Sequence, residues 1–295
     1  MRSLAVFFIL FSNLIFSQVD LINAKKPIDA ENKSINEITP LEYTNIDEND
    51  ILWSRVVYEF IDLNEKLNFP LLFPTNDEQN KIGRKSIWRV LKEHIVNKIE
   101  EDPSGTNLEI YKFDEFSSSD KLSTTEIKDL MSYEFFSRKT GGNQTIYVKS
   151  NEIGGYNIKG IWYFDKKASE LKYRLLGIQP VGANTEDLKN GVQNPNLGSP
   201  YFWIWYPSIR EELNNHLVFN DRNTNNRISF DDLLINRRFS SFIYKYDNIY
   251  GDREIKDYII QRPGESKQQH QLRIILESER IKKEILDFEL DMWGY

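Results

Sequence analysis

The chain of 295 residues contains no cysteine. This absence excludes disulfide bonds, thiolate metal sites, cysteine nucleophiles and the cysteine to which a lipid anchor would be attached. Histidine is scarce too: the three histidines, His94, His216 and His270, lie far apart in the sequence. None stands in an HExxH pattern or in a paired spacing typical of zinc sites. His94 is interpreted as a residue on the flank of a helix.

Other functional signatures are missing as well. The sequence has no GxSxG, GxGxxG or GxxxxGK[ST] motif, so it shows no sign of the nucleophile elbow of an α/β-hydrolase or of a nucleotide-binding loop. A net charge of −7 argues against general nucleic-acid binding. Acidic residues are abundant, but nothing singles out a carboxylate pair for glycoside hydrolysis. An exported hydrolase is therefore ranked behind the two functions described below.

The N-terminus has the pattern of an export signal. Arg2 provides a positive start, Leu4 to Phe11 is largely apolar, and Ser17 precedes a plausible cleavage point at Gln18. The run is too short to span a bilayer, so we interpret residues 1–17 as a secretory signal peptide. The alternative is a buried N-terminal helix. No later stretch approaches about 20 uncharged apolar residues, so we expect no membrane insertion and, in a cell with two membranes, a periplasmic protein.

What the sequence does contain is enough apolar material for a sizeable core, with 40% hydrophobic and 13% aromatic residues. Residues 18–50 are polar and acidic and are interpreted as a flexible N-terminal arm. The pattern changes at Ile51, where we place an α+β core domain over residues 51–260. Residues 261–295 form a C-terminal helical segment. We expect a single main domain with a mostly antiparallel sheet, packed helices and a long C-terminal amphipathic helix.

Helical spacing recurs in several segments. Spacings of three and four predict helices over about residues 51–67 and 85–101, the latter with Ile87, Leu91, Ile95 and Ile99 on one face. Ser123 and Glu126 form a capping-box pattern before a helix whose predicted face includes Phe135. Ser266 and Gln269 suggest another cap, and the final helix is predicted over about residues 267–291, with the apolar stripe Ile274, Ile281, Ile285, Phe288 and Met292.

Alternation indicates strands elsewhere. Residues 158–165 and 171–178 alternate around a polar linker and predict a β-hairpin. Shorter strands are expected at residues 108–113 and 144–149, and residues 180–200 are expected to form a long loop. In residues 202–205, apolar side chains occupy both faces of a predicted strand, with Phe202 and Ile204 on one face and Trp203 and Trp205 on the other.

A polar loop between residues 220 and 232 allows two interpretations. It places Asp221, Asn223, Asn225 and Asp232 in the ligand order of a calcium-binding EF-hand loop. Asn226 replaces the usual glycine, and the acid at the twelfth position is shorter than the usual glutamate. Alternatively, the loop is a turn followed by a cap, with Ser229 and Asp232 spaced to start a helix near Phe230. That helix would bury Ile235, Phe239, Phe242, Ile243 and Tyr246. We favour the turn and cap, and so expect no metal and no cofactor.

Two further groups are candidates for partner binding. Trp203 and Trp205 lie in an aromatic cluster that could form a sugar or peptide platform, although a buried strand explains the same residues. Arg237 and Arg238 could bind acidic groups on a partner, or could lie on a solvated helix face. No residue is singled out as catalytic.

Several ordered blocks of the sequence resemble the GldN/PorN family of gliding-motility and type IX secretion proteins of the Bacteroidetes. The likeness covers roughly residues 51–260. The blocks are Trp53-Ser-Arg-Val, residues 61–71, Ile158-Lys-Gly-Ile-Trp-Tyr-Phe-Asp, Arg174-Leu-Leu-Gly-Ile, Trp203-Ile-Trp-Tyr-Pro, Asn220-Asp, Arg227-Ile-Ser-Phe-Asp-Asp, Phe239-Ser-Ser-Phe-Ile-Tyr and Asp257-Tyr-Ile.

The resemblance implies a non-enzymatic, exported component of a periplasmic ring. Such a component would assemble with an outer-membrane lipoprotein of the same apparatus, contact the periplasmic part of the inner-membrane motor and form a homo-oligomer in the ring. The missing cysteine fits this role, because the lipid anchor would belong to the partner. The resemblance implies neither catalytic residues nor a calcium site. A calcium-dependent binding module centred on residues 221–232 is the alternative function.

Overall fold

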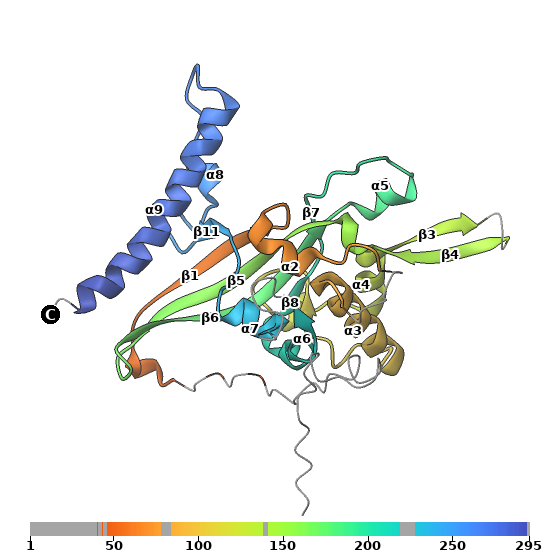
Figure 1. Cartoon of the computed structure of the whole chain (residues 1–295), viewed down its shortest axis with the longest axis horizontal. Coiled ribbons are helices and arrows are strands. Elements are labelled where there is room, and N and C mark those ends of the chain that lie inside the picture. The colour runs from red at the N-terminus through yellow and green to blue at the C-terminus, as the bar shows by residue number, and fades with distance from the viewer. Residues whose placement is uncertain are drawn as a thin grey trace, which may run out of the picture. The chain divides into compact units, whose positions relative to one another are not determined.

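A central antiparallel sheet organises the fold (Figure 1). The computed structural model describes residues 40, 43, 46–77, 84–137, 141–218 and 228–293. Within this part of the chain, the sheet has seven strands in the order β11-β1-β5-β6-β8-β2, with β7 paired to β6. Their bounds are β1 (Ile51–Asp62), β2 (Ile110–Tyr111), β5 (Ile153–Asp165), β6 (Glu170–Gly182), β7 (Ser199–Pro200), β8 (Trp203–Trp205) and β11 (Phe242–Tyr246).

The predicted hairpin is confirmed and is longer at both ends than the alternation indicated. Strands β5 and β6 pair from Asp165↔Glu170 to Ile153↔Gly182. At the turn, the Asp165 carboxylate accepts hydrogen bonds from the backbone N–H groups of Lys167 and Ala168, at 2.9 and 3.1 Å. β5 also pairs with β1 along nearly the whole length of that strand. These long strands form the middle of the sheet.

Strand β1 corrects the helix predicted over residues 51–67. Leu52, Val56 and Phe60 recur every four residues, a spacing that fits one face of a helix but also, being even, one face of a strand. The fully buried residues are instead the odd-numbered Val57, Glu59 and Ile61. Pairing with β5 on one side and β11 on the other decides the conformation. Helix α2 (Phe69–Leu72) begins where the predicted helix was to end.

Helices α3 (Ile87–Glu101) and α4 (Thr124–Met131) confirm two predictions. The four predicted apolar residues of α3 are all buried. Ser123 and Glu126 make the reciprocal bonds of a capping box at the start of α4. The other α-helices are α5 (Thr185–Lys189), α6 (Arg210–Asn215), α7 (Phe230–Ile235), α8 (Ile255–Tyr258) and α9 (Lys267–Trp293). The 3-10 helices are η2 (Glu48–Asp50), η3 (Lys66–Asn68), η4 (Ser118–Asp120), η5 (Ser150–Glu152) and η6 (Tyr206–Ser208).

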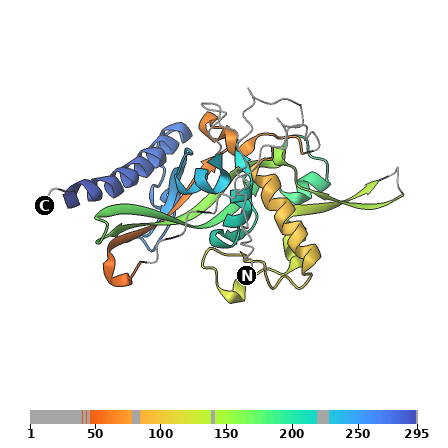
Figure 2. The same cartoon turned by 60° about the horizontal axis from the view of Figure 1, so that its bottom comes forward.

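Two short ribbons extend from these elements. Strands β3 (Ser132–Ser137) and β4 (Gly142–Tyr147) form a hairpin that projects beyond the central sheet (Figure 1, Figure 2). Phe135 belongs to β3 and is half exposed, so it does not lie on the α4 face as predicted, because the helix ends at Met131. Strands β9 (Leu217–Val218) and β10 (Ile228–Ser229) form the second ribbon. The expected loop over residues 180–200 also contains α5 and β7.

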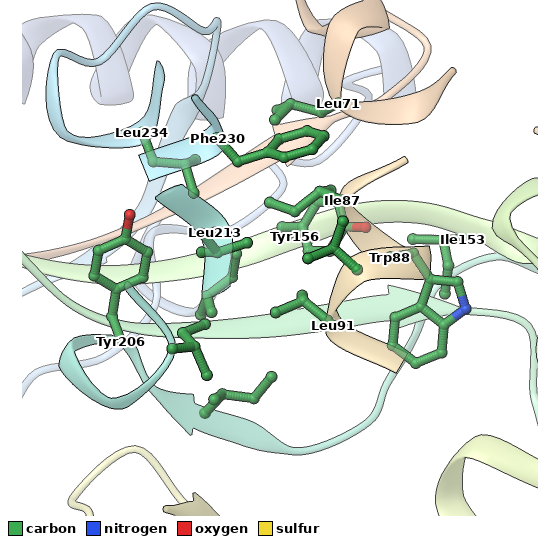
Figure 3. Packing of buried hydrophobic residues seen from close by; sticks show 14 of the residues in the cluster. Leu71, Ile87, Trp88, Leu91, Ile153, Tyr156, Tyr206, Leu213, Phe230 and Leu234 are labelled. Carbon is green, nitrogen blue, oxygen red and sulfur yellow. The ribbon is translucent and has the colours of Figure 1, made fainter. Parts of the chain in front are cut away.

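A large core lies between one face of the sheet and the helices α2, α3, α4, α6 and α7 (Figure 3). Ile61, Tyr156 and Ile158 contribute to it from β1 and β5. Trp88 is a buried residue of α3 and donates its indole N–H to the Val148 carbonyl at 2.9 Å. The indole therefore contributes apolar area while its polar atom stays satisfied.

A second cluster, the C-terminal core, lies under α9 at the β11 end of the sheet. It consists of the buried residues Val57, Ile243, Tyr246, Ile255, Ile281 and Ile285. The predicted C-terminal helix and its Ser266–Gln269 cap are confirmed. The Ser278 hydroxyl accepts the Ile243 backbone N–H at 2.8 Å, so α9 satisfies part of the edge of β11.

The helix predicted to continue from Phe230 to Tyr246 is wrong in its second half. Ser229 caps α7 as expected, by accepting the Asp232 N–H at 3.0 Å. The helix then ends at Ile235, and Arg237 adopts a left-handed conformation with φ of 51°. The alternating residues Phe242 to Tyr246 continue as strand β11.

Candidate interaction surface

A buried ion pair joins the large core to the C-terminal core. Glu59 points from β1 to the same face as Val57 and Ile61, and its side chain is 1% exposed. The Arg237 guanidinium donates to its carboxylate at 2.7 Å, and the Ser241 hydroxyl donates to the same oxygen. A buried carboxylate without such partners would carry a large desolvation cost. This pair fixes the turn after α7 onto the middle of β1.

Aromatic rings surround the Arg237 guanidinium. Its central carbon lies 4.3 Å from the Tyr173 ring centroid, 5.1 Å from that of Trp162 and 5.3 Å from that of Phe239. Gly160 makes this arrangement possible, because a Cβ there would lie 2.1 Å from the Tyr173 hydroxyl. Arg237, predicted from sequence as a partner-binding residue, thus contacts Glu59 and three aromatic rings inside the domain.

The opposite face of the sheet carries an outer aromatic cluster. Its buried members are Tyr58, Tyr111 and Trp203, with Phe116, Trp205 and Tyr244 packed against them. The Phe116 ring lies 4.9 Å from Trp205 and 6.3 Å from Trp203, both edge-on. The prediction that Trp203 and Trp205 share one face and Phe202 and Ile204 the other is confirmed, because the latter two lie in the large core.

A polar network borders this cluster. The Tyr58 hydroxyl donates to the Asp114 carboxylate, and the Lys159 ammonium donates to the Asp114 backbone carbonyl at 2.7 Å. The same ammonium lies 5.2 Å from the Tyr58 ring centroid. Burial opposes ionisation of Asp114, but the Tyr58 hydrogen bond and the charges of Lys159 and Lys245 outweigh it and hold the pKa of Asp114 below its usual value. The network therefore places a carboxylate and ammonium groups beside aromatic rings.

The predicted partner-binding residues are not gathered at one site. Trp203 is buried at 6% exposure and Trp205 is half-buried, both on the outer face of the sheet. Arg237 lies on the inner face, and its neighbour Arg238 is exposed. The roles assigned to these four residues stay predictions.

The calcium hypothesis falls mostly outside the described residues. Asp221, Asn223 and Asn225 are not among them, and Asp232 lies in the first turn of α7. Among the residues that the structure describes, no group of three or more histidine and acidic residues is arranged to hold a metal ion. The calcium alternative stays a prediction.

The structure brings together two histidines that the sequence separates. Glu212 on α6 lies 3.0 Å from Nε2 of His216 and 3.5 Å from Nδ1 of His94 on α3. Burial lowers the pKa of both histidines, and the Glu212 charge partly opposes this shift. The only sequence signal for this contact was the position of His94 on the flank of α3, and nothing indicated which element it would face.

Tyr43, within the predicted N-terminal arm, is held between two arginines. Its ring centroid lies 4.1 Å from the Arg210 guanidinium and 4.9 Å from that of Arg174, and its hydroxyl donates to the Leu175 carbonyl at 3.1 Å. Burial raises the pKa of Tyr43 to about 12. Arg210 in turn pairs with the buried Asp231 at 2.9 Å. This residue of the arm thus contacts the core domain.

Comparison with known proteins provides the family. Across the described residues, no helix is long and apolar enough to cross a membrane. No match is found among curated proteins. The family model described as gliding motility associated protein GldN matches residues 46–294, and so extends through α9, beyond the region expected from the quoted blocks. The chain therefore belongs to the GldN family.

Proposed function

We propose that this protein is a non-enzymatic structural component of the type IX secretion and gliding motility apparatus. It acts in the periplasm, assembles into a ring with an outer-membrane lipoprotein and contacts the periplasmic part of the inner-membrane motor. The observation that carries the proposal is the GldN match over residues 46–294.

The two faces of the sheet support a role in assembly. The inner face is closed by helices, whereas the outer face near β1 and β11 carries partly exposed aromatic side chains. Phe242 is 36% exposed, and its ring lies 5.5 Å from that of the half-buried Phe60. Aromatic residues bordered by charges are typical of protein interfaces. We assign the lipoprotein contact to this outer face, which extends from Phe242 on β11 to Trp205 on β8.

The test is co-expression of the mature chain with the lipoprotein of the same apparatus, followed by size-exclusion chromatography and mass measurement. A large assembly that contains both proteins is expected. Elution of the two as separate monomers would contradict the proposal. A pull-down from envelope fractions with mass spectrometry then identifies the motor contact.

Surface variants locate the contact. Phe242→Ser and Trp205→Ala should each weaken co-assembly while leaving the melting temperature nearly unchanged, because both side chains are only partly buried. Phe135→Ser is the matched control, because Phe135 is 50% exposed but lies on the β3–β4 ribbon. Equal loss in all three variants would remove the assignment to the outer face.

A further inference from the structure

Helix α9 has a second apolar stripe that the fold does not use. The side that faces β1 and β11 is buried through Ser278, Ile281 and Ile285. In both views the opposite side faces away from the sheet (Figure 1, Figure 2). That side bears a row of residues that we name the outer seam: Leu272, Leu276, Glu279, Lys283, Leu286 and Leu290.

The outer seam is unusual for a solvated helix face. Its four leucines are between 53% and 68% exposed. Successive seam residues are four, three, four, three and four positions apart, the alternation of a heptad seam that packs against another helix. At about 1.5 Å per residue, the row from Leu272 to Leu290 is about 27 Å long. A row of this length, with two exposed leucines at each end, points to a helical partner.

The outer seam is also complementary to the outer seam of a second copy that runs in the opposite direction. In an antiparallel pair of α9 helices related by a two-fold axis, Leu272 would face Leu290 of the second copy and Leu276 would face Leu286. At the centre, Glu279 would face Lys283, so opposite charges meet twice across the axis. A parallel pair in register would instead place Glu279 against Glu279. An isologous contact requires such self-complementarity.

We propose that the outer seam is a homotypic docking surface, on which α9 of one chain pairs antiparallel with α9 of a second copy. The leucines at both ends supply the apolar contact, and the Glu279–Lys283 pairs set the register. The proposal goes beyond the proposed function, because a two-fold contact joins two chains and does not by itself close a ring. Self-association is measured on the purified chain alone. The absence of a dimer would therefore contradict this proposal without bearing on co-assembly with the lipoprotein.

Sedimentation of the mature chain should show a concentration-dependent dimer. Leu276→Glu combined with Leu286→Glu should give a monomer over the same range, because four charges would enter the seam. The matched control is Ile249→Glu with Ile260→Glu. These residues are 93% and 73% exposed and lie outside α9, so the dimer should persist. A wild-type monomer at every concentration would overturn the proposal, as would equal loss of the dimer in the control.

Charge exchange tests the register. Glu279→Lys alone should raise the dissociation constant about tenfold, roughly 1.4 kcal/mol, because two like-charged contacts replace two opposite ones. Combining it with Lys283→Glu should restore the dimer. A parallel pair would gain nothing from the double exchange, so that result would overturn the antiparallel arrangement.

Cysteine cross-linking gives a geometric test without background, because the chain contains no cysteine. Leu276→Cys and Leu286→Cys should form a disulfide with each other when the two variants are mixed. Each variant alone should not cross-link, because its two thiol positions would lie about 15 Å apart along the helix pair. Cross-linking of each variant alone, or none in the mixture, would contradict the proposal.

Discussion

The large core and the C-terminal core share one face of the sheet but are closed in different ways. The large core receives side chains from five strands of the sheet and from five α-helices, and it contains Trp88, Tyr156, Phe202 and Phe230 at 1% exposure or less. The C-terminal core has six buried residues and is closed mainly by α9, with one residue from α8. The first is a shared interior, whereas the second is a docking contact for one helix. This difference predicts that the two ends of the domain have different local stabilities.

The largest effect is expected in the large core. Phe202→Ala should lower the free energy of unfolding of the whole domain by about 3–5 kcal/mol, because it leaves a cavity beneath several elements. Phe202 is 0% exposed, whereas Phe242, the control, is 36% exposed on the outer face. Phe242→Ala should cost much less in chemical denaturation. Similar costs at both positions would show that the large core is not the main source of stability.

Loss of the ion pair between the two cores should have an effect of similar size. Arg237→Met removes the partner of Glu59 and leaves a buried carboxylate, which typically costs about 3–5 kcal/mol. Arg238→Met is the matched control, because Arg238 is the next residue in the chain and its side chain is exposed. Thermal unfolding of both variants tests the comparison. If only Arg238→Met abolishes co-assembly while Arg237→Met changes stability alone, the two arginines have separate roles.

A smaller and more local effect is expected under α9. Ile281→Ala should cost about 2–4 kcal/mol, but chiefly by releasing α9 from β11 rather than by unfolding the large core. Hydrogen exchange should accelerate in residues 267–293 and in β11, while α3 stays protected. Ile275→Ala, at a residue 51% exposed on the same helix, is the control and should change little. Uniform acceleration across the domain would refute the separation of the two cores.

The same two regions show what the sequence could predict. Features set by local chemistry were found: the α3 face, the Ser123 and Ser266 capping boxes, the β5–β6 hairpin and the start of α9. Strand β1 was missed because a spacing of four residues satisfies both a helix and a strand, and only pairing with β5 and β11 decides between them. Strand β11 was missed because it depends on the left-handed turn at Arg237, which Glu59, 178 residues away, holds in place.

Contacts between distant elements account for the rest of the candidate site. Trp203 and Trp205 were assigned to one face from alternation alone. Phe116, which packs against Trp205, and Asp114, which accepts the Tyr58 hydroxyl, lie on a loop that no sequence pattern connects to the sheet. Likewise, no sequence pattern singled out Glu59, and its burial became visible only once β1 was placed in the sheet. Sequence periodicity indicates which side of an element is buried but not what covers it.

The smallest effect is expected from pH, and it probes the helical side of the large core. Burial lowers the pKa of His94 and His216 below the ordinary value of 6.5, so the unfolded chain binds protons at these residues before the folded chain does. Their contribution to stability is therefore complete above about pH 6.5 and falls as the pH drops below it. Glu212→Gln should make this loss of melting temperature between pH 7.5 and 5.5 steeper, because the carboxylate that favours both protonated rings is removed. Glu211→Gln, at the exposed neighbouring position, should leave the pH profile unchanged. A profile that Glu212→Gln leaves as in the wild type would show that the α3–α6 contact does not govern acid sensitivity.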